Sequence, residues 1–83
     1  MSTDTTVIPS LRSQIDELDQ RIIELVNQRA ELSRQVQEHR LANGGMRLEL
    51  GRERNILQTY RDALGEPGTA LADAVLRTCR GAL

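Results

Sequence analysis

A heptad pattern of apolar residues in the first half of the chain most constrains how it can fold. Its positions recur at alternating gaps of four and three: Leu11, Ile15, Leu18, Ile22, Leu25, Leu32 and Val36. This spacing is typical of a helix that packs lengthwise against other helices. No turn signal interrupts the pattern before Asn43, Gly44 and Gly45, so the sequence predicts a helix of about 50 Å from Ser10 to Ala42.

The length of this helix predicts a partner. Only about half of the 83 residues follow Gly45, and they cannot cover the whole apolar seam. A chain this small usually needs a staple or a partner, but Cys79 is the only cysteine and His39 the only histidine. These facts argue against a disulfide and against a metal site. We expect an all-α chain of three helices, with one long N-terminal helix, that forms an intertwined homodimer.

Turn signals divide the rest of the chain into two shorter helices. Glycines at 44 and 45 end the first helix, and the run Gly65-Glu66-Pro67-Gly68 separates the second from the third. Strand signals are absent, because no run of alternating β-branched residues occurs. The predicted elements are a disordered tail at residues 1–9 and a helical domain at residues 10–83, whose later helices span about 48–64 and, from Gly68 or Thr69, about 68–81.

Composition excludes several classes of protein. All basic residues are arginine, and the 11 arginines face 12 acidic residues for a net charge of −1. Nucleic-acid binders usually show a basic excess and aromatic platforms, whereas Tyr60 is the only aromatic residue here. No apolar stretch approaches membrane-spanning length, and residues 1–9 lack the core of a signal peptide. We therefore expect a cytoplasmic protein that binds neither nucleic acid nor membranes.

One position of the apolar seam holds a charge. Arg29 occupies the heptad position between Leu25 and Leu32. A guanidinium buried there costs on the order of several kcal/mol unless an anion pairs with it. Arg12 opens the same helix and Arg40 closes it, about 42 Å away. Arg12 and Arg40 could therefore share one small site only if two helices ran antiparallel in a dimer.

The later helices add charged residues to such a site. Around the start of the second helix lie Glu49, Arg52 and Glu53, and the third helix offers Arg77 and Arg80. This set contains fixed guanidiniums and carboxylates but no nucleophile, metal ligand cluster or histidine base. Arginine binds carboxylates bidentately and stays charged when buried, so the set favours a small dianion. It also suits a reaction that needs electrostatic stabilisation of its transition state and restraint of the substrate's conformation, without covalent catalysis.

Two motifs together resemble the all-helical chorismate mutases. The first is LRSQIDELD at residues 11–19, and the second is the later Arg52-Glu53-Arg54. The resemblance covers about Leu11 to Leu57 well and the third helix weakly. The short length, the Gly44-Gly45 pair and Arg80 near the end are similar to the small subclass that works in complex with DAHP synthase. The resemblance implies rearrangement of chorismate to prephenate, for phenylalanine and tyrosine synthesis, without a cofactor.

The resemblance also implies a role for each arginine of the site. Arg29 and Arg52, together with Arg12 from the other subunit, would bind the two carboxylates of the substrate. Arg40 would stabilise the negative charge that grows on the ether oxygen as the carbon–oxygen bond breaks. Arg80 is the candidate for a further contact with that oxygen, where the family usually has an amide or an acid on the third helix.

The two acids receive roles from the same resemblance. Glu53 would accept a hydrogen bond from the ring hydroxyl of the substrate, and Glu49 would help to orient that hydroxyl. The same pair could instead favour an ammonium, which would make the chain an aminodeoxychorismate mutase of secondary metabolism.

A non-enzymatic interpretation also stays open. Arg29 could fix the register of two helices by pairing with a carboxylate of the partner helix. A helical dimerisation or adaptor module of this kind predicts that Arg12, Arg29 and Arg52 are met by carboxylates of the protein itself.

Overall fold

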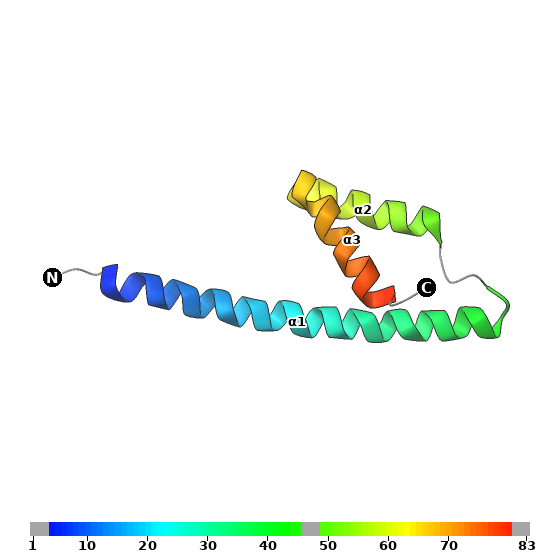
Figure 1. Cartoon of the computed structure of the whole chain (residues 1–83), viewed down its shortest axis with the longest axis horizontal. Helices are drawn as coiled ribbons and strands as arrows, with labels where there is room; N and C mark the ends of the chain where they lie inside the picture. Colours follow the sequence, from blue (N-terminus) through cyan, green and yellow to red (C-terminus); the bar gives the residue numbers. More distant parts are fainter. Residues whose placement is uncertain (1–3, 46–48, 81–83) are drawn as a thin grey trace.

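The computed structural model of the chain describes residues 4–45 and 49–80, and all of its regular structure is helical (Figure 1). Its elements are α1 (Asp4–Ala42), α2 (Leu50–Leu64) and α3 (Glu66–Arg80). Helix α1 is a rod that runs the length of the molecule, and α2 and α3 fold back over its second half (Figure 1). The predicted all-α chain with one long N-terminal helix is confirmed. No helix in the described ranges is long and apolar enough to cross a membrane.

Helix α1 begins earlier than the sequence predicted. It starts at Asp4, so the predicted start at Ser10 is wrong, and Pro9 lies inside the helix. Proline removes one backbone N–H and so costs one helical hydrogen bond, but near an exposed helix start this loss does not stop the helix. The division into a tail at residues 1–9 and a domain at residues 10–83 stays a prediction, although residues 4–9 are helical here.

Helix α2 begins at Leu50, slightly later than predicted. The predicted start at residue 48 lies outside the described residues. Glu49 was predicted inside this helix but precedes it, in an extended conformation with φ −114° and ψ 99°. Its side chain makes no capping hydrogen bond to the helix. The Glu49 carboxylate pairs with Arg40 of α1 instead.

A single glycine makes the turn between α2 and α3. Gly65 has a φ of 80°, and its N–H donates to the Arg61 carbonyl oxygen at 2.8 Å. Helix α3 then starts at Glu66, so the predicted start at Gly68 or Thr69 is wrong. Pro67 fits the first turn of a helix, because an N–H at that position would have no partner within the helix.

Helix α3 carries the buried core of the described residues. Its buried apolar side chains are Ala72, Leu76 and Cys79. Gly68 is also buried, and a Cβ built there would lie 2.4 Å from the Tyr60 carbonyl oxygen. Small residues therefore let α3 approach α2 closely. Helix α3 also contacts α1, whereas α1 and α2 do not contact each other within the described ranges.

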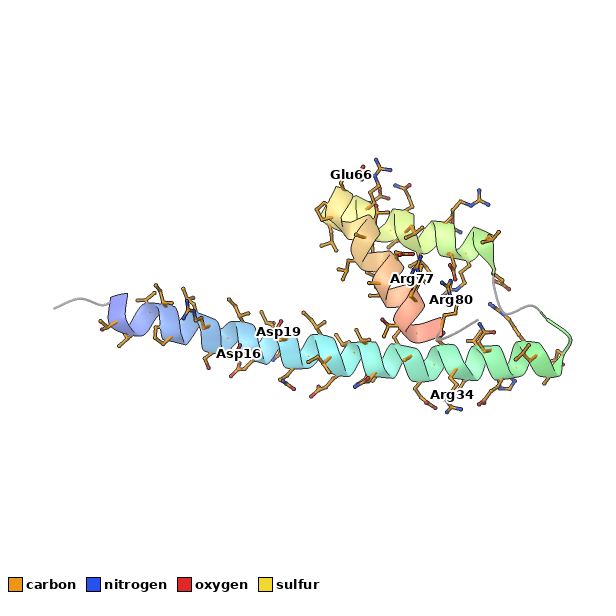
Figure 2. All side chains as sticks on the ribbon, in the orientation of Figure 1. Asp16, Asp19, Arg34, Glu66, Arg77 and Arg80 are labelled. Atoms are coloured by element: carbon orange, nitrogen blue, oxygen red, sulfur yellow. The ribbon has the colours of Figure 1, made fainter. Side chains whose placement is uncertain are left out.

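The apolar seam of α1 is not covered by its own chain. Its leucine, isoleucine and valine side chains are 48% to 62% exposed. Figure 2 shows the first half of α1 projecting beyond α2 and α3, with Asp16 and Asp19 among its side chains. The accessible surface is 6749 Å², against about 5,000 Å² for a compact monomer of this size. This open seam is what the predicted homodimer requires, and the dimer itself stays a prediction.

We expect Gly68→Ala to lower the free energy of unfolding by about 1–3 kcal/mol, because the added methyl group would overlap the Tyr60 carbonyl. Gly51→Ala is the matched control, since a Cβ at this α2 position meets nothing within 4 Å. Alanine is more favourable than glycine in a helix by roughly 0.5–1 kcal/mol, so the control should keep or raise stability. Thermal unfolding followed by circular dichroism measures both, and equal melting temperatures would contradict the close packing of α3 on α2.

Candidate active site

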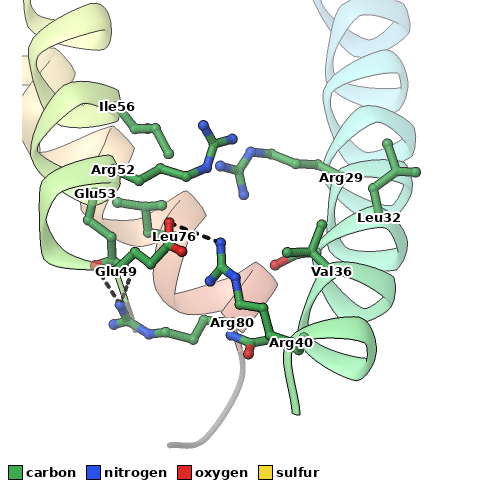
Figure 3. A pocket seen from close by; sticks show the side chains of 12 residues that line it. Arg29, Leu32, Val36, Arg40, Glu49, Arg52, Glu53, Ile56, Leu76 and Arg80 are labelled. Atoms are coloured by element: carbon green, nitrogen blue, oxygen red, sulfur yellow. Dashed lines mark hydrogen bonds and ion pairs between the residues drawn. The ribbon is translucent and has the colours of Figure 1, made fainter. Parts of the chain in front are cut away.

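A cavity of about 240 Å³ lies between α1, α2 and the end of α3 (Figure 3). It exists because α3 touches both other helices while α1 and α2, as far as they are described, do not touch each other. Every residue to which the family resemblance gives a role lines this cavity, except Arg12, and Arg77 does not line it either. Its charged side chains are Arg29 and Arg40 of α1, Glu49, Arg52 and Glu53 at the start of α2, and Arg80 at the end of α3.

Helical spacing explains how these side chains reach one cavity. On α1, Arg29, Val36 and Arg40 are separated by seven and four residues, so they share one face of the helix. On α2, Arg52 and Glu53 are followed by Ile56, which lies about one turn further on the same side. The glycine turn at Gly65 sends α3 back from the end of α2 toward α1 (Figure 1), and the side chain of Arg80, its last residue, reaches Glu53 in the first turn of α2.

The tightest polar contact of the site joins α2 to α3. Nη1 of Arg80 donates to both carboxylate oxygens of Glu53, at 2.6 Å and 2.5 Å. The two side chains are only 17% and 24% exposed, so water screens this ion pair less than a surface pair. Because the pair ties the end of α3 to the first turn of α2, it fixes the position of both side chains.

A second, looser ion pair joins the end of α1 to Glu49. Nη2 of Arg40 lies 3.1 Å from the Glu49 carboxylate, and the side chains are 25% and 52% exposed. The chain turns directly after Arg40: the N–H groups of Asn43 and Gly45 both donate to its carbonyl oxygen. Gly44 takes a φ of 76° in this turn, a conformation that favours glycine. The position of Arg40 therefore depends on the Gly44–Gly45 turn and on Glu49.

The remaining two arginines have no counter-ion among the described residues. Figure 3 shows the guanidiniums of Arg29 and Arg52 pointing toward one another from α1 and α2. Within the parts of the chain that the structure describes, no carboxylate lies within 4.0 Å of either one. Two facing cations repel each other unless an anion lies between them. The described residues of the same chain therefore supply no carboxylate to either guanidinium, whereas the adaptor interpretation expects one from the partner helix.

Arg12 lies far from the cavity. It is exposed on the part of α1 that extends beyond α2 and α3. Its place on the uncovered stretch of α1 would let it reach the cavity of a second, antiparallel copy. That role stays a prediction.

Several residues that were not predicted from the sequence also line the cavity. Gln37 adds an amide, and Ser33 adds a hydroxyl on the same helix. Their signal was present in the sequence, because both lie at helical spacing between Arg29 and Arg40. The apolar part of the wall comes from Leu32, Val36, Ile56 and Leu76.

The charge of the cavity indicates what it can bind. Four guanidiniums and two carboxylates line it, which leaves a net charge of +2. The two carboxylates already pair with Arg40 and Arg80, so the excess charge lies on Arg29 and Arg52. A small molecule with two carboxylates would neutralise both of these cations and could accept bidentate hydrogen bonds from them.

Comparison with known proteins gives consistent matches. The family model for chorismate mutase type II matches residues 11–80. The chain is 45% identical over 76 residues to an intracellular chorismate mutase of Mycolicibacterium smegmatis. The alignment covers 92% of this chain and 73% of that relative. The chain is 43% identical over 76 residues to an intracellular chorismate mutase of Mycobacterium tuberculosis, covering 92% and 71%.

A solved structure is similar over nearly the whole chain. It is described as a non-covalent complex of DAHP synthase and chorismate mutase from Corynebacterium glutamicum with bound transition state analog. The matched chain superposes with a TM-score of 0.93 at 35% sequence identity, and the match covers 99% of both chains.

We expect Glu53→Gln to lower the free energy of unfolding by about 1 kcal/mol, because Arg80 would lose its carboxylate partner. Arg52→Gln should leave stability unchanged or raise it, since it removes one of two facing cations. Urea unfolding of both variants at one protein concentration measures the difference. A loss in Arg52→Gln as large as in Glu53→Gln would mean that Arg52 has a counter-ion within the protein.

Proposed function

The chain belongs to the type II chorismate mutases, and on this premise we propose that it binds chorismate in the cavity between α1 and α2. There it rearranges chorismate to prephenate, the branch step toward phenylalanine and tyrosine. The observation that carries this assignment of the site is the facing pair Arg29 and Arg52, which has no carboxylate partner among the described residues. Chorismate has two carboxylates, which match the net charge of +2 on the cavity wall.

Arginines hold the substrate by its carboxylates. Arg29 and Arg52 point into the cavity from opposite walls, so each can take one carboxylate or both can share one. Arg12 of a second copy would supply a third guanidinium. Contacts from several directions restrict the substrate to the compact conformer in which the reacting carbons lie close together.

Arg40 stabilises the charge that develops during the reaction. The carbon–oxygen bond of the ether breaks as the new carbon–carbon bond forms, and negative charge grows on the ether oxygen. A guanidinium has five N–H donors, and one nitrogen of Arg40 contacts Glu49. The other donors remain for the ether oxygen, where a fixed cation lowers the energy of the transition state more than that of the ground state.

The acids orient the ring of the substrate. Glu53 accepts a hydrogen bond from the ring hydroxyl, and Glu49 lies beside it at the start of α2. Neither acid needs to transfer a proton, because the rearrangement is intramolecular. Glu49 and Glu53 hold the ring in the orientation in which Arg40 faces the ether oxygen.

The working unit is a homodimer. The seam of α1 is about half exposed along its length, and a second antiparallel copy would cover it. Stable homodimers of this kind bury roughly 2,000–5,000 Å² in total, and the surface that this chain exposes beyond a compact monomer is of that order. The antiparallel arrangement would bring Arg12 of each copy to the cavity of the other.

DAHP synthase is the proposed second partner of the chain, and the proposed location of both is inside the cell. The similar solved structure is a complex of a chorismate mutase with DAHP synthase, and the curated relatives are called intracellular. The structure of this chain offers a physical route for activation by such a partner. Arg40 is placed by the Gly44–Gly45 turn and by the half-exposed Glu49, so a protein that fixes this turn would fix Arg40.

We expect Arg40→Ala to lower kcat by about 10²- to 10³-fold, since it removes the cation at the ether oxygen. Arg34→Ala is the matched control, because Arg34 projects from the side of α1 away from α2 and α3 (Figure 2). Arg34 pairs only with Glu31 and Glu38 among the described residues, all on the exposed surface. Loss of chorismate absorbance measures turnover by each purified chain, alone and with DAHP synthase.

Two results would contradict the proposal. Turnover by Arg40→Ala close to that of Arg34→Ala would remove Arg40 from the mechanism. A wild-type rate that does not change on titration with DAHP synthase would remove the synthase as the activating partner.

A further inference from the structure

We propose that Arg80 is a positioning residue, which holds the Glu53 carboxylate at the end of α3 and so keeps it from pairing with the substrate-binding arginines. This inference rests on the proposed function, because it takes Arg29 and Arg52 as ligands of the substrate carboxylates. It gives Arg80 a different role from the contact with the ether oxygen that the family resemblance implies.

The geometry of the pair supports this role. A single nitrogen, Nη1 of Arg80, reaches both oxygens of Glu53, and both side chains are largely shielded from solvent. Nε of Arg80 is buried and has no hydrogen-bond partner among the described residues. Figure 3 shows the Glu53 carboxylate turned toward Arg80 at the edge of the cavity, while Arg52 extends the other way toward Arg29. Among the described residues, Glu53 is therefore the side chain with which Arg80 forms hydrogen bonds and an ion pair.

Competition for Glu53 explains why such a residue is needed. Glu53 follows Arg52 directly in the chain and lines the same cavity as Arg29 and Arg40. A partly buried carboxylate without a partner is costly, so in the absence of Arg80 it would turn to one of these cations. Each such pairing would occupy a guanidinium that the substrate requires. With Arg80 in place, Arg29 and Arg52 keep their charge available for a dicarboxylate.

The pair leaves Glu53 able to act on the substrate. A carboxylate has about four lone-pair sites, and Arg80 uses one on each oxygen. A hydroxyl group of the substrate can therefore donate to Glu53 without displacing Arg80. The pair thus orients Glu53 and does not block it.

The other ion pairs near the site do not hold Glu53 away from the substrate-binding arginines. The pair of Arg40 with Glu49 is longer and more exposed, and it does not involve Glu53. On α3 itself, Arg77 lies about one turn before Arg80 and pairs with Asp73 on the exposed surface. Arg77 has the same charge, on the same helix end, but it does not line the cavity. It is therefore a matched control for Arg80.

The test measures kcat and KM for chorismate with the full chain, in the presence of DAHP synthase. We expect Arg80→Ala to lower kcat/KM by roughly 10- to 100-fold, with a raised KM, because Glu53 would compete for the cations that bind the substrate. Arg80→Lys should recover part of this loss, since an ammonium can also bridge two carboxylate oxygens. Arg77→Ala should match the wild type.

A double-mutant comparison separates positioning from support of the fold. In a Glu53→Gln background, Arg80→Ala should change kcat/KM by no more than about two-fold, because the neutral amide does not compete for the arginines. Equal losses in the two backgrounds would overturn the inference. If Arg80→Ala does not fold, Arg80→Gln provides the same comparison. Absence of turnover by the wild-type chain, alone and with DAHP synthase, would overturn the proposed function itself, whereas an active wild type with equal losses overturns only the role of Arg80.

Discussion

The placement of two cations, Arg29 and Arg52, on opposite walls of one cavity is the constraint on which the proposed site depends. Two guanidiniums face each other across a cavity, and the described part of the chain gives neither a carboxylate. The fold must hold them together against their mutual repulsion, and an anion that binds between them relieves it.

Helix α3 is the element that makes this arrangement possible. It contacts both α1 and α2, while those two remain apart and leave room for the cavity. Gly68 lets α3 lie close to α2, and Arg80 at its other end fixes Glu53. Helix α3 thus contacts both walls of the cavity and holds one of its charged side chains, Glu53.

The sequence predicted those features that follow from local spacing. The seam of α1, the three helices, and the charge at Arg29 in an apolar slot could all be read from helical periodicity. The pairing of Arg80 with Glu53 could not, because it joins residues 27 positions apart and depends on the angle that the Gly65 turn gives to α3. The start of α1 was missed because Pro9 indicates a helix boundary but does not enforce one.

The proposed dimer builds each catalytic site from two copies of the chain, with Arg12 from one and Arg52 from the other. The most direct measurement is the chorismate mutase activity of dimers formed by co-expressing Arg12→Ala and Arg52→Ala chains. Each variant alone should be nearly inactive, whereas the mixture should recover up to about one quarter of the wild-type rate, because half of the dimers are mixed and each of these has one intact site. A mixture no more active than the two variants measured separately would contradict a site built from both copies.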